Sequence, residues 1–472
     1  MKGLILTSRA RAGESASYSV WTPDDGGVIR DIDSTLSLKP GESISTGDEG
    51  EIHSAEIGDG AELAKKHAAW LDEFVDRGIG KKAHSSGIDG LDTVTKTLWK
   101  QLSACGALVL KKLGCAAPII VRFHNDSDGA GGAYGLFASL NEFSGNSGHF
   151  ANKGNTIWIM HAGISYGRYD AETDLMIAGS YTSIEKPLLI VIDFGTTTES
   201  NDGIRRISDA FDVVWLDHHP VVEEFSGKKL AHYVNPWLHG GDSAYTAGFL
   251  ACMLGKTFSE VDTSAMESAS LIGDYSKYAA DSEGGEDLSI LLDMLTSDVK
   301  VAFGPAVTSI TPYEIDKVVQ DPGRMGELVS YARMRLSEAI GDAMMQVKKH
   351  VAAQGSVYVL DFEAVKSEQT KYPLPGRFSS KLLDKITETD QKPAVLIVHS
   401  GKYISVRVGA ELAERVDLVD VIGEMKDRHP EEIEAGGGHR SASGIKLAAQ
   451  DEKGRIVRDL VSIIKDRMDR AA

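Results

Sequence analysis

The stretch PLLIVIDFGTTTESNDGIRRISDAFDVVWLDHHP spans residues 187–220 and decides the fold. It holds two apolar runs of strand length, at 187–194 and 212–217. Two similar runs precede them, PIIVRF (118–123) and NTIWIM (155–160), and helix-like segments or turns separate most of the four. Continuous apolar strands that alternate with helices predict an α/β fold with a parallel sheet covered on both faces.

The composition is that of an ordinary folded protein. The chain has 472 residues, of which 42% are hydrophobic and 25% charged, so it is not a disordered, collagen-like or coiled-coil chain. No apolar run approaches the roughly 18–20 residues that span a bilayer, and the first residues make a poor signal peptide. Three cysteines without disulfide or metal-ligand spacing are consistent with a cytoplasmic protein, at positions Cys105, Cys115 and Cys252.

The negative charge is distributed unevenly along the chain. The formal net charge is −19, which argues against broad contact with nucleic acid. Residues 346–472 hold 21 Lys and Arg against 20 Asp and Glu, a net charge of +1. A polyanionic substrate is therefore expected to bind locally, to this near-neutral part of the chain.

Carboxylates and histidines follow three of the predicted strands. The run 118–123 leads into His124-Asn125-Asp126-Ser127-Asp128, the next into Asp193, and the last into Asp217-His218-His219. Ligands of open α/β sheets bind beyond the carboxyl ends of the strands, so these side chains are expected at one edge. A lone DxD is usually a solvated turn, and a lone Asp193 suits a helix N-cap. Crowded together, however, these charges repel one another unless cations bind, which predicts a site for Mg²⁺ or Mn²⁺.

The glycines after the first strand invite a competing interpretation. Gly129, Gly131 and Gly135 resemble a dinucleotide-binding fingerprint, but the third position of G-x-G-x-x-G is Tyr134. Two acidic residues also stand where pyrophosphate would lie. The small residues instead predict a helix that begins close beneath the metal site.

Taken in order, these motifs resemble the DHH phosphoesterase superfamily. The matching stretches are H-N-D-S-D-G (124–129), Asp193, D-H-H (217–219), Gly273-Asp274, and G-G-G-H (436–439) followed by Ala442 and Gly444. The last is similar to the signature of the DHH-associated C-terminal domain. With the pattern of strands and helices, this implies four parts: an N-terminal segment of unknown role (1–60), a DHH catalytic domain with a parallel sheet (61–325), a helical connector (326–355) and a smaller α/β substrate-binding domain (356–472).

The resemblance implies a binuclear centre that holds two divalent ions, Mn²⁺ in preference to Mg²⁺, with Asp193 bridging them. By motif position the ligands are His124, Asp126, Asp128, Asp193, His218 and Asp274. Asp217, His218 and His219 are the implied catalytic residues; His219 would touch the scissile phosphate or support a ligand, and Asp217 would ligate or orient its neighbours. Water activated by the two ions would attack phosphorus.

The C-terminal domain is implied to hold the substrate. Backbone N–H groups of Gly436, Gly437 and Gly438 in a glycine-rich turn would approach a phosphate closely, and His439 would add a donor. Arg407 lies where the family places a phosphate-binding arginine. Arg377 and Arg440 are weaker candidates, because an exposed arginine is usually only solvated.

Within the superfamily, the leading His and the Gly after the second Asp resemble archaeal RecJ-like proteins. The first expectation is therefore a metal-dependent exonuclease on single-stranded DNA or RNA. The alternatives are a phosphodiesterase for short oligonucleotides or cyclic dinucleotides, and a replication or repair scaffold with residual nuclease activity. A replisome or repair-helicase partner and homo-oligomerisation are further expectations; a membrane partner is not.

Overall fold

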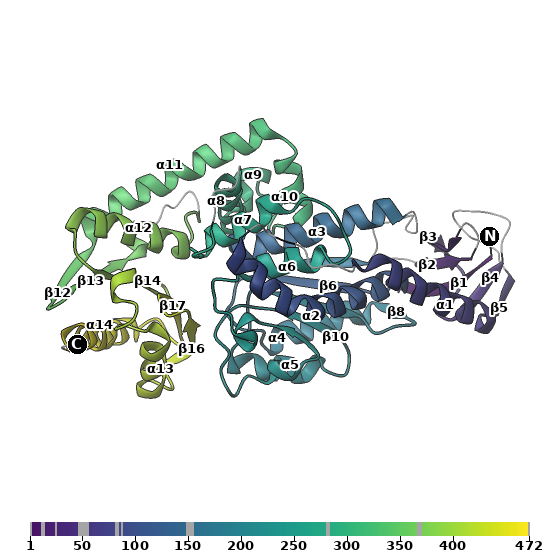
Figure 1. Ribbon diagram of the computed structural model, residues 1–472, viewed down its shortest axis with the longest axis horizontal. Helices are drawn as coiled ribbons and strands as arrows, with labels where there is room; N and C mark the ends of the chain where they lie inside the picture. Colours follow the sequence, from purple (N-terminus) through teal and green to yellow (C-terminus); the bar gives the residue numbers. More distant parts are fainter. Residues whose placement is uncertain are drawn as a thin grey trace. The chain divides into compact units, whose positions relative to one another are not determined.

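The computed structural model divides into two compact units (Figure 1). The first unit comprises Met1–His124 and Asp128–Glu286, and the second comprises Asn125–Ser127 and Asp287–Ala472. The four parts inferred from the sequence are functional ranges, and they stay a prediction. The structure describes residues 2–10, 15–23, 26–45, 56–80, 85, 88–147, 155–279, 284–365 and 371–470.

A five-stranded sheet forms the centre of the first unit, and every neighbouring pair in it is parallel. This confirms the predicted fold class. The four apolar runs are all strands, and the short β11 was not expected from the sequence. In spatial order the strands are β11 (His232–Val234), β10 (Asp212–Leu216), β9 (Leu188–Ile192), β6 (Ile119–His124) and β7 (Thr156–His161).

Helices cover both faces of this sheet. Side chains of β9 and β10 on one face share a buried cluster with Ala171 of α4 (Arg168–Gly179) and Ile204 of α5 (Asn201–Ile207). The opposite face receives α3 (Ser127–Ser147) and α6 (Ala247–Gly255): a Cβ on Gly132 would lie 2.6 Å from the Cα of Gly248 and 3.2 Å from Ile192. A Cβ on Gly129 would lie 2.5 Å from the His124 carbonyl oxygen, so α3 begins close against the end of β6, as the small residues predicted. Further helices of this unit are α2 (Asp89–Gly114) and α7 (Ser264–Gly273).

Residues before the five-stranded sheet form a second, antiparallel sheet in the first unit. Alternating apolar residues give it two buried faces; one carries Leu4, Leu6 and Trp21 and packs on Leu63 of α1 (Ala61–Gly78). Strand β8 (Tyr181–Ser183), far along the chain, pairs with β1 and ties this sheet to the segment before β9. Its main path runs β3 (Val28–Ser34), β2 (Ala16–Thr22), β1 (Lys2–Ala10), β4 (Glu42–Ser45) and β5 (Glu56–Asp59).

We expect His67 of α1 to make this region acid-sensitive. The ring is 3% exposed, lies against Trp21 and Trp70, and its Nε2 is 2.9 Å from the carbonyl oxygen of Gly114. Burial lowers the His67 pKa below its ordinary value of 6.5, against the opposing effect of that carbonyl. Because the unfolded chain then binds a proton that the folded chain does not, stability falls as the pH drops below about 6.5.

The measurement is the Tm at pH 7.5 and pH 5.5. A His67→Gln variant should lose part of the fall in Tm between the two values, whereas the exposed His350→Gln should behave like the parent protein. An unchanged fall in the His67→Gln variant would contradict this assignment.

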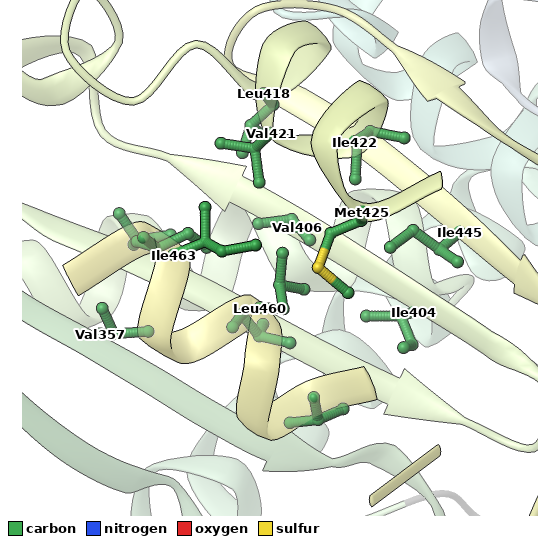
Figure 2. Close-up of a cluster of buried hydrophobic side chains, with 14 of the residues drawn as sticks. Val357, Ile404, Val406, Leu418, Val421, Ile422, Met425, Ile445, Leu460 and Ile463 are labelled. Atoms are coloured by element: carbon green, nitrogen blue, oxygen red, sulfur yellow. The ribbon is translucent and has the colours of Figure 1, made fainter. Parts of the chain in front are cut away.

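The second unit contains a mixed six-stranded sheet. The apolar runs PAVLIVHS (393–400) and KYISVRV (402–408) are separated by one glycine, which predicts a hairpin. The structure confirms it, because β14 (Ala394–Ser400) and β15 (Tyr403–Val408) pair antiparallel. Helices α13 (Leu418–Arg428) and α14 (Lys453–Asp469) cover one face, burying Met425, Leu460 and Ile463 against Val406 and Ile445 (Figure 2). The other face packs on α11 (Pro322–Gln346) and α12 (Pro375–Asp390). The remaining strands are β12 (Lys348–Ala352), β13 (Gly355–Asp361), β16 (Ile433–Gly438) and β17 (Ala442–Leu447), and the remaining helices α8 (Gly285–Ser297), α9 (Val299–Phe303) and α10 (Pro312–Val319).

The helical pattern expected to run to Gly355 ends at Gln346, so that part of the prediction is wrong. Residues Lys348–Ala352 instead pair antiparallel with β13 as an edge strand. Helical periodicity does not detect this exchange, because the edge strand is mostly exposed and lysine-rich, as edge strands often are. Within the described residues, no helix combines the length and the apolar character that crossing a membrane requires.

Candidate metal centre and substrate-binding face

Parallel pairing brings three predicted site residues to one edge of the central sheet. Ile192 of β9 is in register with Phe123 of β6 and with Leu216 of β10. The residues that follow these three are His124, Asp193 and Asp217. The predicted convergence of the strand ends is therefore what the register produces.

His218 lies at the centre of this edge. Its ring is 1% exposed, and Nε2 is 3.1 Å from an oxygen of Asp274, 3.2 Å from one of Asp193 and 3.6 Å from one of Asp128. Burial alone would lower the pKa of His218, but the carboxylates of Asp193, Asp274 and Asp128 outweigh it and raise the pKa well above the ordinary value. The three carboxylates therefore strongly favour a positive charge at this point.

The orientation of the His218 ring is compatible with a metal ion as the source of that charge. Its Nδ1 is 2.7 Å from the carbonyl oxygen of Ser243, which only accepts, so Nδ1 carries the proton and donates it. In the neutral ring the lone pair of Nε2 then faces three carboxylates. One imidazole nitrogen and carboxylate oxygens form a donor set that Mn²⁺ accepts, so the residues present fit a divalent cation.

Asp128 is held rigidly for this role. The side chain is 0% exposed, and its oxygens accept from the backbone N–H groups of Ala247 (3.0 Å) and Gly248 (2.8 Å) and from the Ser270 hydroxyl. Position 248 must be glycine, because a Cβ there would lie 2.4 Å from the Asp128 carbonyl oxygen. The N-terminus of α6 thus stabilises a buried carboxylate whose charge it complements.

Asp217 orients the histidines beside it. It is fully buried and accepts hydrogen bonds from the backbone N–H of His218 (2.8 Å), from Nδ1–H of His219 (2.7 Å) and from the Thr196 hydroxyl (2.5 Å). Burial would raise its pKa, but the charges of His219 and His218 and these hydrogen bonds lower it well below the ordinary range. With its oxygens engaged by donors of the chain, Asp217 acts on the orientation of its neighbours.

His219 is the more accessible of the two histidines. Its side chain is 30% exposed, and Nδ1–H is fixed on Asp217. Burial acts to lower the His219 pKa, but the negative charge of Asp217 raises it above the ordinary value. The charge of Asp217 therefore favours the positively charged form of the His219 ring.

Asp193 occupies a strained backbone position. Its φ is +70°, which is uncommon for a residue other than glycine. The turn is held by the Asp193 N–H on the Leu216 carbonyl (2.9 Å) and by the Trp215 indole N–H on the Phe194 carbonyl (3.0 Å). Strain at this point is consistent with a carboxylate whose direction is imposed by the fold.

Of the predicted metal ligands, the first unit brings together His124, Asp128, Asp193, His218 and Asp274. Nδ1 of His124 lies 3.6 Å from an oxygen of Asp193. Asp126 lies in the turn between β6 and α3, in the segment Asn125–Ser127 that belongs to the second unit. Its role as a ligand stays a prediction that rests on its place between His124 and Asp128.

The second unit places Arg407 and Gly437 on one face of its sheet. Arg407 pairs with Ala442, and Gly437 pairs with Gly444, which itself pairs with Ser405, two residues from Arg407. Directly paired residues share a face, and so do residues two apart. Arg407 is held on this face by the hydroxyls of Ser380 (3.1 Å) and Ser405 (3.2 Å). No heavy atom lies within 4 Å of the place where a Cβ of Gly437 would stand.

The glycines form a strand rather than the expected turn. Gly436, Gly437 and Gly438 end β16 and pair with β17, and the turn follows at His439, whose N–H donates to the Ala442 carbonyl (2.7 Å). Cross-strand pairing, which no local pattern reveals, extends the backbone here. A Cβ on Gly436 would meet Ile422 of α13, so this glycine lies on the opposite face from Gly437.

The two weaker arginine candidates have structural partners. Arg377 is 7% exposed and pairs with Asp293 and Ser289 of α8, so it is a buried ion-pair residue. Arg440 forms a surface ion pair with Asp417 at 2.8 Å.

Several residues that position the ligands were missed by sequence reasoning. They are Thr196, Ser243 and Ser270, which supply a hydroxyl or carbonyl to Asp217, His218 and Asp128 respectively. Serines and threonines of this kind carry no distinctive spacing. Only the run of threonines after Asp193 offered a signal.

The edge of histidines and carboxylates, together with the match of residues 118–273 to the DHH family model, supports the class of metal-dependent phosphoesterases. Residues 118–273 match the model of the DHH family, N-terminal domain. The predicted resemblance is thereby confirmed.

Relatives are distant in sequence. The chain is 23% identical over 402 residues to the uncharacterized protein MJ1198 of Methanocaldococcus jannaschii, covering 74% of this chain and 52% of that protein. It therefore spans about half the length of this curated relative.

Among solved structures, the DHH domain of PF0399, described as a member of a family of ribosomal proteins, superposes with a TM-score of 0.70 at 19% identity. That match covers 86% of this chain and 99% of the other and shows a shared fold. RecJ of Thermus thermophilus, solved with Mn²⁺, is similar with a TM-score of 0.47 at 14% identity, over 81% of this chain and 59% of that one.

Proposed function

We propose that the protein is a Mn²⁺-dependent exonuclease that hydrolyses single-stranded DNA or RNA. The observation that carries the metal-dependent part is the buried Nε2 of His218, turned toward Asp128, Asp193 and Asp274. The proposal of a nucleic-acid substrate draws on the face of the second unit where Arg407 lies beside open glycine backbone. Mn²⁺ is favoured over Mg²⁺ because the donor set mixes imidazole with carboxylate.

The residues of the site have two kinds of role, holding the cations and orienting the histidines. His124, Asp126, Asp128, Asp193, His218 and Asp274 would hold two divalent cations, which when bound acidify water and offset charge on the phosphoryl oxygens. Ser243 turns the His218 ring, and Asp217 holds Nδ1–H of His219. Because its Nδ1–H is fixed on Asp217, His219 would present Nε2 to a phosphoryl oxygen.

End-labelled DNA and RNA of graded length, incubated with Mn²⁺ or Mg²⁺, test this proposal. Stepwise shortening of long strands supports the exonuclease. Activity confined to strands of about 2–5 nucleotides or to cyclic dinucleotides would support the alternative phosphodiesterase. Absence of hydrolysis with either ion, together with capture of a replisome or repair-helicase partner, would support the scaffold; the oligomeric state follows from light scattering of the same sample.

Gly437→Ala tests the substrate-binding face. The new methyl group meets no heavy atom within 4 Å, so we expect an unchanged Tm. A phosphate close to the backbone would be displaced, and KM for a single strand should rise roughly tenfold, as expected for loss of one hydrogen bond to a charged group.

Gly423→Ala in α13 is the matched control, because a Cβ there also meets nothing within 4 Å. Its KM should stay unchanged. Equal KM values for the two variants would place the phosphate elsewhere.

A further inference from the structure

Two of the three exposed aromatic side chains in the described part of the first unit adjoin metal ligands. Trp237 is 44% exposed and Tyr275 is 45% exposed; the third, Tyr169, lies on α4. Single exposed aromatic residues are common on protein surfaces, so exposure alone decides nothing. The way these two are held distinguishes them.

Trp237 is fixed against the metal centre through its polar edge. Its indole N–H lies 3.1 Å from both the His218 carbonyl oxygen and the Ser243 hydroxyl, and its backbone N–H donates to Asn235 (3.0 Å). Asn235 is fully buried and donates in turn to the His219 carbonyl (3.0 Å). The indole therefore has a set orientation relative to both histidines.

Tyr275 directly follows Asp274, whose carboxylate oxygen is 3.1 Å from His218 Nε2. Its φ of +52° is strained for a bulky side chain. The next residue, Ser276, donates to the Ala244 carbonyl (2.6 Å), which joins this segment to the one that carries Ser243. Trp237 and Tyr275 thus stand on two linked segments beside the His218–Asp274 pair.

We infer that Trp237 and Tyr275 form a stacking rim for nucleobases, so that the centre prefers phosphodiesters that carry bases over other phosphoesters. This rests on the proposed function and specifies the substrate class of the same site. An indole anchored by its N–H keeps its ring faces available, and base–aromatic stacking tolerates any base. Such a rim would hold the base next to the scissile phosphate without reading sequence.

The experiment compares a single-stranded oligonucleotide with one of equal length whose terminal residues are abasic tetrahydrofuran units. In Trp237→Ala we expect KM for the base-carrying strand to rise roughly 10- to 100-fold, while KM for the abasic strand stays unchanged. Trp237→Phe should restore most of the affinity, and Tyr275→Ala should act in the same direction as Trp237→Ala. Tyr169→Ala is the matched control and should change neither value.

Two outcomes would contradict the stacking rim. One is an equal rise in KM for the base-carrying and the abasic strand in Trp237→Ala. The other is a weaker Mn²⁺ affinity of Trp237→Ala by calorimetry, which would make Trp237 a positioning residue for His218.

A failure of the proposed function can be distinguished from a failure of this inference: in that case the parent protein hydrolyses neither strand. Calorimetric binding of adenosine 5′-monophosphate and ribose 5-phosphate in the presence of Mn²⁺ then decides the inference. Tighter binding of the nucleotide, lost in Trp237→Ala, supports the rim; equal binding of the two compounds overturns it.

Discussion

Replacing Asp193 by asparagine should remove bound metal and lower the phosphodiesterase rate on the order of 10³-fold or more. The cations supply several kcal/mol of charge stabilisation, and each 1.36 kcal/mol corresponds to a factor of ten in rate. Asparagine is the informative replacement, because it tolerates the φ of +70° at this position while it removes the charge. Alanine would add backbone strain to the loss of the ligand.

Mn²⁺ stoichiometry by calorimetry and the hydrolysis rate measure this effect, with circular dichroism to monitor folding. Asp209→Asn, at an exposed aspartate of the same unit, is the matched control and should retain both metal and rate. Full metal content in Asp193→Asn would contradict its role as a ligand. Loss of the folded spectrum would make Asp193 a structural residue.

Replacing Arg377 by methionine should destabilise the second unit by about 3–5 kcal/mol, because it leaves the Asp293 carboxylate buried without its partner. The two side chains are 7% and 4% exposed and are in direct contact. Burial raises the pKa of Asp293, and Arg377 opposes that rise. The other Asp293 oxygen accepts from the Ser127 N–H at 2.8 Å, so this pair also supports the turn that carries Asp126.

The urea midpoint measures the destabilisation. Arg440→Met is the matched control, because its ion pair with Asp417 is exposed and should contribute less than about 1 kcal/mol. In the double variant Arg377→Met, Asp293→Asn, part of the stability should return, since no buried charge remains. A single variant as stable as the parent protein would show that Arg377 does not compensate Asp293.

Much of the fold was accessible from local patterns. The four apolar runs of the central sheet and the two strands of the 393–408 hairpin were predicted at nearly their observed bounds, whereas the helices between the strands of the central sheet were expected without bounds. Buried strands and amphipathic helices show a recognisable pattern of apolar residues within about ten positions. The exposed β12 does not, and it was taken for the end of a helix.

The metal centre was accessible for a different reason. In a parallel sheet, residues that follow buried strands converge at one edge, so the order of strands and charged residues predicts which side chains meet. His124, Asp193 and Asp217 obey this rule through the register of β6, β9 and β10. The serines, threonines and carbonyls that orient the ligands could not be predicted from the sequence, because any such residue can form the same hydrogen bond.

The sequence alone predicts a parallel α/β protein that resembles the DHH superfamily and has a site for divalent cations at one edge of its sheet. Local periodicity and strand-end chemistry need no knowledge of distant contacts. Tertiary structure alone decided that Gly436–Gly438 are a strand, that Arg377 is buried beside Asp293 and that Trp237 is anchored on His218. Each of these depends on a specific partner, β17 for the glycines, α8 for Arg377 and the His218 carbonyl for Trp237. Packing and buried hydrogen bonds select these partners, and the residue pattern of one segment does not encode them.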